Sequence, residues 1–384
     1  MDFELSEEQE QMRQLARRFA REEMRPVAAE YDESEETPWP VLEKAARIGL
    51  LSYPYPEEYG GGGVDSVLTS CLVAEELSWG CLGIATSILG CGLAAIPIAL
   101  FGNQAQKERY LPWFCDEEQL KMGALALTEP EAGSDVASMR TSAARDGDHY
   151  ALNGQKRFIT LGGIAHLYAL FATVDPGRGH EGITAFIIEA DTPGLSAGKK
   201  EQKMGMRASH TGDVILENIR VPLENRLGEE GQGFYIAMKC FEHTRPTVAA
   251  CAVGVARAAY EYALEYAQQR VQFGKPIIAK QAVRFMLADM ATEIEAARLL
   301  TWRAAWLADK GLPCNVPASM AKSYAADMAM QATINAVQIL GGYGYMREYP
   351  VEKWMRDAKI LQIVEGTSQI QKVVVSQMLA MGME

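Results

Sequence analysis

The sequence contains little of what a metal centre or a disulfide framework would need. Its 384 residues include seven cysteines and five histidines. No Cys-x-x-Cys pair occurs, and the histidines are too scattered to form a ligand cluster, so the pattern predicts no metal site. Unpaired, scattered thiols are typical of a reducing compartment. We therefore expect a cytoplasmic protein whose cysteines are free and mostly buried.

Long apolar runs, an excess of positive charge and a targeting segment are missing as well. The longest weakly polar stretch, residues 82–101, is interrupted by glycines and by Pro97, so no membrane span is expected. The net charge of −13 argues against a general affinity for nucleic acid or for an anionic membrane. The first residues are acidic and show no signal or transit pattern. The composition, 48% hydrophobic and 23% charged, is that of a soluble globular protein.

Several well-known catalytic motifs are absent. The glycine run 60–63 could cradle a phosphate, but no strand precedes it and no Gly-Lys-Ser/Thr ending follows it. We therefore interpret it as a connecting loop. No Gly-x-Gly-x-x-Gly stands at a strand-helix junction, so a Rossmann dinucleotide site is not indicated. A Ser-His-Asp arrangement and a kinase signature are missing too.

A change of periodicity divides the chain into three parts. Residues 1–122 have helical periodicity, and residues 123–230 are short alternating or apolar runs between turn residues, with Asn153-Gly154 as a hairpin signal. Residues 231–384 are helical again, with about four long helices. We therefore predict an α+β multidomain fold with an N-terminal all-α domain, a middle antiparallel β-barrel or sandwich and a C-terminal four-helix bundle. Helices are expected over residues 6–34, 41–51, 66–79, 82–100, 104–114, 234–269, 280–310, 318–340 and 368–381.

One carboxylate stands out near the end of the chain, that of Glu365. Apolar residues precede it, Gly366 follows it, and a helix start comes next, with Ser368 and Gln371 at the spacing of a capping box. Burial raises the pKa of such an acid, and a nearby helix N-terminus lowers it. An acid tuned between those limits can act as a general base near neutral pH. The alternative is a solvated loop residue ahead of a helix.

Three further segments carry groups that could bind a flat, polar cofactor. Residues 127–135, beside a strand end, offer hydroxyls and open backbone N–H groups, although a turn built only for shape would use the same residue types. Phe158 and Thr160 stand two residues apart on an expected strand, so ring and hydroxyl share one face, and core packing of the ring is the alternative. In the turn 270–275, arginine and glutamine could bind a pyrophosphate and Phe273 could cover an adenine, or the turn could simply cap a helix end.

Together these segments resemble the acyl-CoA dehydrogenase family along nearly the whole chain. Each motif alone is weak, but their shared order argues strongly against chance. The short-chain and medium-chain members are the most similar, through residues 242–246 and 349–353. The motifs that follow the family's order are residues 127–135, 153–156 with 158–160, 203–205, 227–233, 270–273, 338–342 and 365–369.

The resemblance implies a non-covalently bound FAD at the junction of the middle domain and the C-terminal bundle. The family is usually a homotetramer, a dimer of dimers, and the implied FAD contacts from Arg270 to Gly342 would be made to a neighbouring subunit. Along the acyl-CoA would lie Ser134, Glu242, Arg245 and Gly366. The positions that match the family's cofactor-binding residues are Leu125, Leu127, Thr128, Ser134, Phe158, Ile159, Thr160, Arg270, Gln272, Phe273, Gln281, Gln338, Gly341, Gly342, Thr367 and Gln369.

The resemblance also implies a role for Glu365. It would remove the α-proton of a short- to medium-chain acyl-CoA while a hydride passes from the β-carbon to flavin N5, giving a trans-2-enoyl-CoA. The thioester oxygen needs hydrogen-bond donors as enolate charge develops, and in the family these are the backbone N–H of the base and a flavin ribityl hydroxyl. An electron-transfer flavoprotein would accept the electrons.

Some positions qualify the resemblance. In one branch of the family the base stands at the position of Thr244, and because threonine cannot act as a base, Glu365 is favoured. Phe158 replaces a frequent tryptophan and Val364 a frequent tyrosine, which alters the flavin packing and the pocket wall. The apolar residues 89–95 should line the acyl pocket. Two alternatives on the same fold are an acyl-CoA oxidase-type flavoenzyme and a homologue that binds flavin or CoA without turnover.

Overall fold

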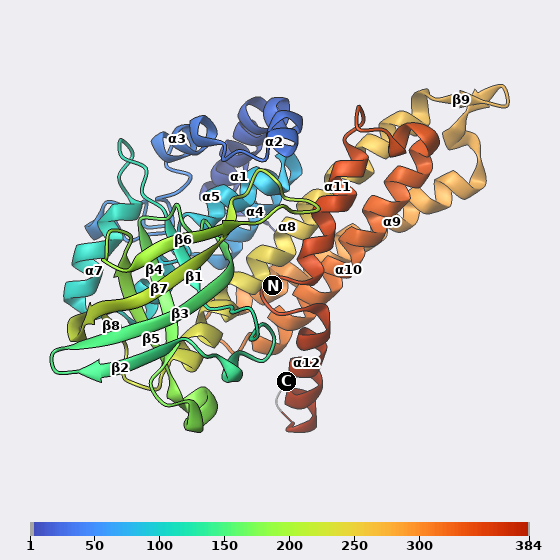
Figure 1. Cartoon of the computed structure of the whole chain (residues 1–384). Helices are drawn as coiled ribbons and strands as arrows, with labels where there is room; N and C mark the ends of the chain where they lie inside the picture. Colours follow the sequence, from blue (N-terminus) through green and yellow to red (C-terminus); the bar gives the residue numbers. More distant parts are fainter. Residues whose placement is uncertain (1–3, 383–384) are drawn as a thin grey trace.

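The computed structural model describes residues 4–382, which form three parts (Figure 1). The N-terminal helices, blue and cyan in the figure, lie beside a green β-sheet, and the long yellow-to-red helices form a bundle that extends away from both. One cluster of buried hydrophobic residues includes members of all three parts, such as Leu77, Leu152 and Val253. The three parts therefore share a continuous core.

The N-terminal helices largely match the expected positions. The single helix expected over residues 6–34 is wrong, because a π-helical segment, Ala20–Met24, and a 3-10 turn, Arg25–Val27, interrupt it. Pro26 explains the break, since proline lacks the N–H of a regular helix and its ring crowds the preceding turn. The helices are α1 (Glu7–Phe19), α2 (Ala28–Ser34), α3 (Trp39–Arg47), α4 (Val67–Gly80), α5 (Leu82–Gly90), α6 (Ala95–Phe101) and α7 (Gln104–Tyr110).

The helix expected over residues 82–100 also divides, into α5 and α6. Gly92 lies in the break, where a Cβ atom would collide with the hydroxyl of Tyr55. In this break the Cys91 carbonyl accepts a hydrogen bond, at 2.7 Å, from the N–H of Gly123 at the start of the sheet. The break therefore ties the middle part to the N-terminal helices.

The middle part is one mixed sheet. Its strand order is β6-β7-β3-β2-β4-β5-β8, with β1 paired to β4. The expectation of an antiparallel barrel or sandwich needs two corrections: β1 and β4 are parallel, as is the single pair Ser142 and Thr173 of β2 and β4, and the strands of residues 4–382 do not close into a barrel. The strands are β1 (Gly123–Ala126), β2 (Ser142–Asp146), β3 (His149–Thr160), β4 (Leu167–Thr173), β5 (Ile183–Glu189), β6 (Leu195–Lys200), β7 (Thr211–Pro222) and β8 (Arg226–Leu227).

The hairpin signal Asn153-Gly154 does not mark a turn. Both residues lie inside β3, at a register shift between Leu152 and Gly154 against β7. The side chain of Thr141 occupies the space where a Gly154 Cβ would stand. The glycine therefore serves a bulge and a close approach, which is its other common use within a strand.

The C-terminal part contains the four expected long helices. The helix expected over residues 234–269 is α8, which contains Pro246, whereas the short helix α11 after Pro350 was not predicted. Within residues 4–382, no helix has the length and apolar character needed to cross a membrane. The elements are α8 (Gly233–Gln269), β9 (Val271–Gln272), β10 (Lys275–Pro276), α9 (Gln281–Asp309), α10 (Asn315–Leu340), α11 (Val351–Ala358) and α12 (Ser368–Ala380).

Candidate active site

An apolar cavity of about 780 Å³ lies where the three parts meet. Its walls come from the segment before α4, from α5 and α6, from the end of β3, from α8 and from the segment before α12. Among the described residues that line it there is no lysine or arginine. Such a cavity suits an uncharged hydrocarbon chain. Its lining includes Tyr53, Tyr55, Thr86, Leu89, Leu93, Ile96, Thr160, Met206, Thr244, Val248, Leu361 and Glu365.

Glu365 forms part of the cavity wall. Its carboxylate accepts a hydrogen bond from the Thr244 hydroxyl at 2.6 Å. Burial raises the pKa of Glu365, against the lowering effects of the Thr244 hydrogen bond and of the positive charges of Arg245 and Lys322. A raised pKa moves the carboxyl toward the range that a general base needs near neutral pH. Glu365 is thus half-buried in a cavity wall and bonded to another side chain, which disfavours the alternative of a solvated loop residue.

The backbone of Glu365 offers a second functional group. Its φ of 52° lies in the left-handed region, which non-glycine residues rarely adopt. Its N–H has no hydrogen-bond partner within residues 4–382. A carboxylate and a free N–H donor therefore stand on the same residue, and such a donor can stabilise negative charge that develops on a carbonyl oxygen.

The capping box expected at Ser368 and Gln371 does not form, and the N-cap lies one residue earlier. Thr367 is the N-cap of α12, and its side chain accepts a hydrogen bond from the Ile370 N–H at 3.1 Å. Gln371 instead reaches back to the carbonyl groups of the turn that carries the acid. Gln371 therefore links the start of α12 to the loop before it through two hydrogen bonds.

The segment after β1 has the open donors expected of a cofactor site. The Leu127 carbonyl accepts a hydrogen bond from Lys156 Nζ at 3.1 Å, and the Thr128 carbonyl accepts one from the Arg157 N–H at 2.9 Å. The N–H groups of Leu127 and Thr128 have no partner within residues 4–382. Unpaired N–H groups in a largely buried segment are costly. This segment, with Leu125 in the adjoining strand, therefore fits the polar edge of a flavin ring.

The end of β3 presents its three expected cofactor residues differently. Phe158 is 57% exposed with a φ of 59°, whereas Ile159 is buried in the core. Thr160 lines the same cavity as Glu365. A register shift between Lys156 and Ile159 interrupts the regular alternation of the strand. The expectation that ring and hydroxyl share a face by simple alternation is therefore not supported, but Phe158 is open to a ligand.

A second group of expected cofactor residues lies away from this cavity. Figure 1 shows hairpin β9–β10 at the far tip of the helical bundle. Phe273, in its turn, is 92% exposed. The Arg270 guanidinium lies 5.2 Å from the ring centre of Tyr343, which brings the hairpin to the segment after α10. The members that are exposed and do not line the Glu365 cavity are Gln272, Phe273, Gln281, Gln338, Gly341 and Gly342.

The expected substrate-contacting residues occupy different environments. Ser134 is exposed in the turn after Leu127. Glu242 forms an ion pair with Lys239 at 2.8 Å. Arg245 is buried beneath the site, where it donates to Asn315 Oδ1 at 2.8 Å.

The remaining expected residues lie around the acid. Gly366 follows Glu365 directly, and its φ of 87° favours glycine. Thr367 caps α12, and Gln369 is exposed on that helix. In the expected acyl pocket, Leu89 and Leu93 line the cavity, whereas Cys91 is buried outside its lining.

Several residues around the site were missed by the sequence analysis. Lys322, on α10, donates a hydrogen bond to the Gly366 carbonyl at 2.7 Å. Tyr53 and Tyr55 line the cavity, and the Tyr53 hydroxyl donates to Ser70 Oγ at 3.2 Å. The one sequence signal that could have pointed to Lys322 is a charged residue within the apolar run of α10. The two tyrosines gave no such signal, because their segment was expected to be a connecting loop.

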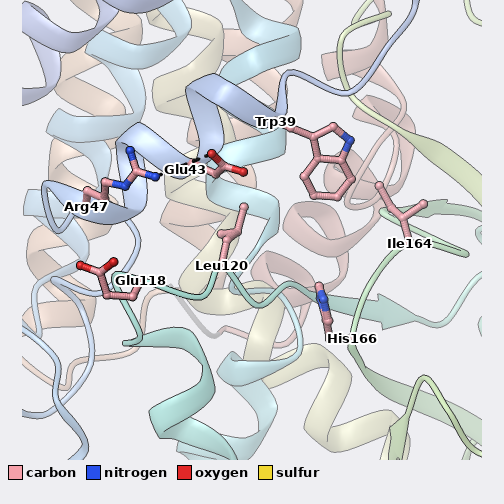
Figure 2. Close-up of a pocket in the computed structure, with 7 residues that line it drawn as sticks. All are labelled: Trp39, Glu43, Arg47, Glu118, Leu120, Ile164 and His166. Atoms are coloured by element: carbon pink, nitrogen blue, oxygen red, sulfur yellow. Dashed lines mark ion pairs between the residues drawn. The ribbon is translucent and has the colours of Figure 1, made fainter.

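A second hollow, of about 410 Å³, lies between α3 and the sheet and shares no lining residue with the Glu365 cavity (Figure 2). Glu43 and Arg47 form an ion pair along its wall at 3.8 Å. His166 is its one imidazole, and the Nδ1 atom of that ring already accepts a hydrogen bond from the Met122 N–H at 3.2 Å. We assign no reaction to this hollow, because its titratable groups serve local contacts.

Comparison with known proteins gives the family. The acyl-CoA dehydrogenase N-terminal, middle and C-terminal domain models match residues 6–118, 124–219 and 231–380. A short-chain-specific acyl-CoA dehydrogenase of Clostridium acetobutylicum is 47% identical over 378 residues, which are 98% of this chain and 99% of that relative. The solved butyryl-CoA dehydrogenase of Megasphaera elsdenii has a TM-score of 0.96 and 44% identity, over 99% of this chain and 100% of that one.

A further similar chain comes from a structure described as the electron transferring flavoprotein of Acidaminococcus fermentans. It has a TM-score of 0.95 and 44% identity, and the match covers 99% of each chain. The domain models and the relatives agree with one another and with the motifs of the Glu365 site. The chain therefore belongs to the acyl-CoA dehydrogenase family and is an FAD-dependent oxidoreductase that acts on acyl-CoA thioesters.

Proposed function

We propose that Glu365 is the base that removes the α-proton of the acyl-CoA, so that the product is a trans-2-enoyl-CoA. The observation that carries the proposal is a carboxyl group with a raised pKa in the wall of an apolar cavity. FAD, when bound, supplies the acceptor for the hydride that leaves the β-carbon. The free N–H of Glu365 is placed to donate to the thioester oxygen, where negative charge develops as the proton leaves.

The substrate is a short- to medium-chain acyl-CoA with an uncharged chain. The cavity wall is mostly hydrocarbon, with hydroxyl groups, the acidic residues Glu57, Asp65 and Glu365 and the imidazole of His243, and it has no lysine or arginine among the described residues. A carboxylate at the end of the chain would be buried without a lysine or arginine partner and near acidic side chains, which is strongly unfavourable. The names of the short-chain-specific and butyryl-CoA relatives support the shorter chains.

The flavin ring is held by the residues around the cavity and after β1. The open N–H groups of Leu127 and Thr128 and the exposed ring of Phe158 support this assignment. The other assigned contacts near the ring and the base are Leu125, Ser134, Ile159, Thr160, Thr367 and Gln369. Acyl-CoA contacts are assigned to Ser134, Glu242, Arg245 and Gly366.

The contacts to the FAD of a neighbouring subunit are assigned to the far end of the bundle. The 92% exposure of Phe273 supports this, because a large aromatic ring at a tip is a common sign of a partner surface. The assembly would then be a homotetramer, a dimer of dimers. The residues assigned to this contact are Arg270, Gln272, Phe273, Gln281, Gln338, Gly341 and Gly342.

Three broader features complete the proposal. The electron acceptor is an electron-transfer flavoprotein, for which the Acidaminococcus fermentans match gives support. The enzyme works in the cytoplasm, which agrees with its seven free cysteines. The domains extend over residues 1–122, 123–230 and 231–384, close to the ranges of the family models.

An anaerobic titration tests the proposal. Flavin absorbance is followed as butyryl-, octanoyl-, isovaleryl- and palmitoyl-CoA are added to the purified holoenzyme. We expect rapid bleaching by butyryl- or octanoyl-CoA, and a rate about 10²- to 10⁴-fold lower in Glu365→Gln. A flavin that none of the four acyl-CoA compounds bleaches would refute the proposal. In a separate assay in air, rapid oxygen consumption would point to an acyl-CoA oxidase instead.

A further inference from the structure

Three hydrogen bonds from two buried side chains converge on the turn that carries Glu365. Lys322 Nζ donates to the Gly366 carbonyl at 2.7 Å. Gln371 Nε2 donates to the same carbonyl and to that of Glu365, both at 3.0 Å. Lys322 and Gln371 are both fully buried. The Gly366 carbonyl is therefore held by side chains of both α10 and α12, and the Glu365 carbonyl by α12 alone.

The turn needs such support because its backbone is in an unfavourable conformation. Glu365 and Gly366 have φ values of 52° and 87°. The left-handed region is disfavoured for a residue with a side chain, and it persists where the surroundings hold it. Hydrogen bonds to both carbonyls define the orientation of the two peptide groups. They therefore set where the Glu365 carboxylate stands relative to Thr244 and to the cavity.

Lys322 differs from the other fully or largely buried lysines of the chain. Lys156 pairs with Glu129 at 2.7 Å, and Lys353 pairs with Asp357 at 2.5 Å. Lys322 makes no ion pair within 4 Å in the part of the chain described, and its hydrogen bond goes to a neutral carbonyl. A buried ammonium group without a touching carboxylate is costly. Burial lowers the pKa of Lys322 to about 8, and among the nearby carboxylates Glu365 opposes this lowering most.

The charges around Glu365 come from two helices. From α8, Thr244 donates a hydrogen bond and Arg245 supplies a positive charge, and from α10, Lys322 supplies a second one. Two buried thiols of α8, Cys240 and Cys251, are near enough for Glu365 to add to their raised pKa. On the far side, Lys322 is also within the field of Asp327 and Arg245. Lys322 is therefore one of two cations that oppose the effect of burial on the acid.

We propose that Lys322 is a positioning residue for the base: its ammonium group holds the Gly366 carbonyl, and through it the turn that carries Glu365 in the cavity wall. Gln371 completes the support of the turn. The inference rests on the proposed role of Glu365 as the base. It assigns to α10 a part in catalysis that involves no contact with the substrate.

The test compares Lys322→Gln and Lys322→Met with Lys322→Arg. Glutamine removes the charge and keeps a donor, methionine removes both, and arginine keeps both. Lys372→Gln is the matched control. Lys372 lies on α12, outside the cavity, where its side chain is exposed and its Nζ atom is 3.5 Å from Oδ2 of Asp327 on α10. For each holoenzyme, the rate of anaerobic flavin reduction by butyryl-CoA is measured from pH 5.5 to pH 9, together with FAD content and thermal unfolding.

The pH profile distinguishes a role in positioning the base from a merely structural one. Without the Lys322 charge, burial is less opposed and the pKa of Glu365 rises, so more of the acid is protonated at low pH. We expect Lys322→Gln to lose about tenfold in rate at the acid end of the profile and little at the alkaline end. Lys322→Met should also lose rate at alkaline pH, because the turn is no longer held. Lys322→Arg and Lys372→Gln should follow the wild-type profile.

A second readout isolates proton removal from flavin reduction. Acetyl-CoA has α-protons but no β-carbon, so the exchange of its methyl protons with D₂O, followed by NMR, reports the base alone. The same acid-end loss is expected in Lys322→Gln. A Lys322→Gln profile that coincides with wild type in both assays, with an effect on unfolding only, would overturn the inference. So would an Lys322→Arg profile displaced as far as that of Lys322→Gln. A wild-type enzyme that is bleached by no acyl-CoA would instead refute the proposed function.

Discussion

Replacing Lys156 with methionine should destabilise the middle part of the protein strongly. Lys156 is fully buried, and its ammonium donates to the Glu129 carboxylate at 2.7 Å and to the Leu127 carbonyl at 3.1 Å. Methionine removes both bonds and leaves a carboxylate that is 5% exposed without its cation. Loss of one partner of a buried ion pair costs about 3–5 kcal/mol. The backbone N–H groups of Arg140 and Thr141, at 2.6 and 3.0 Å, still bind Glu129 and favour the lower value.

A double variant makes the reasoning testable. In Glu129→Gln/Lys156→Met the buried charge is gone, and the amide oxygen can still accept the backbone N–H bonds. The double variant should therefore be more stable than Lys156→Met alone. Lys199→Met is the control, because the Lys199 side chain is 65% exposed in its pair with Glu201, where about 0–1 kcal/mol is at stake.

Urea unfolding followed by far-UV circular dichroism gives the stability, and FAD content reports the segment that Lys156 holds through Leu127. Lys156→Met should also lose FAD more readily, because the open N–H donors of Leu127 and Thr128 are no longer held in place. The account is refuted if the double variant is destabilised by the sum of the two single changes or more. It is also refuted if Lys156→Met unfolds at the same urea concentration as Lys199→Met.

Three further predictions concern the cavity. Thr244→Val removes the hydroxyl donor at 2.6 Å that favours the charged form of Glu365, so the pKa of Glu365 should rise and flavin reduction should slow at acid pH. Thr244→Ser keeps the hydroxyl and should retain the wild-type pH profile. Equal profiles for the two variants would contradict this account. Gly366→Ala puts a Cβ atom 2.5 Å from Gln371 Nε2 at a φ of 87°, so it should lower the free energy of unfolding in urea by about 1–2 kcal/mol and also slow turnover. In the control Gly311→Ala, the new Cβ stands in open space at a φ of 64°, so only the stability should fall. Glutaryl-CoA should not bleach the flavin at a rate comparable to butyryl-CoA, because no lysine or arginine of the described residues lines the cavity; comparable stopped-flow rates would show that a carboxylate is accommodated.

The sequence predicted the positions of helices well where the signal was local. The cap of α4 at Ser66 and the long apolar periodicity of α9 and α10 can be read within one or two turns of chain. Two predicted helices were too long, because Pro26 and Gly92 each lie at a break. Gly92 lies against the hydroxyl of Tyr55, a contact that the local sequence does not reveal. The bulge at Gly154 was misread as a turn, since the same residue pair serves both.

The site was predicted in part for the same reason. Glu365 and Gly366 form a recognisable motif, and the structure places the acid in the wall of an apolar cavity. Lys322 could not be assigned to it, because its contact with Gly366 joins residues 44 positions apart and depends on how α10 packs. The parallel pairing of β1 with β4 is likewise set by the path of the chain between them and not by the side-chain pattern of either strand.

The hydrogen bond between Thr244 and Glu365 joins positions 121 residues apart, and the wall of the cavity draws on residues from Leu50 to Glu365. No fragment shorter than residues 50–365 therefore contains the whole wall of the cavity. We expect proton removal only after the N-terminal helices, the sheet and the bundle have come together. During synthesis or refolding, the appearance of acyl-CoA-dependent bleaching would mark the arrival of the fully folded molecule, and partly folded chains would contribute no signal to it.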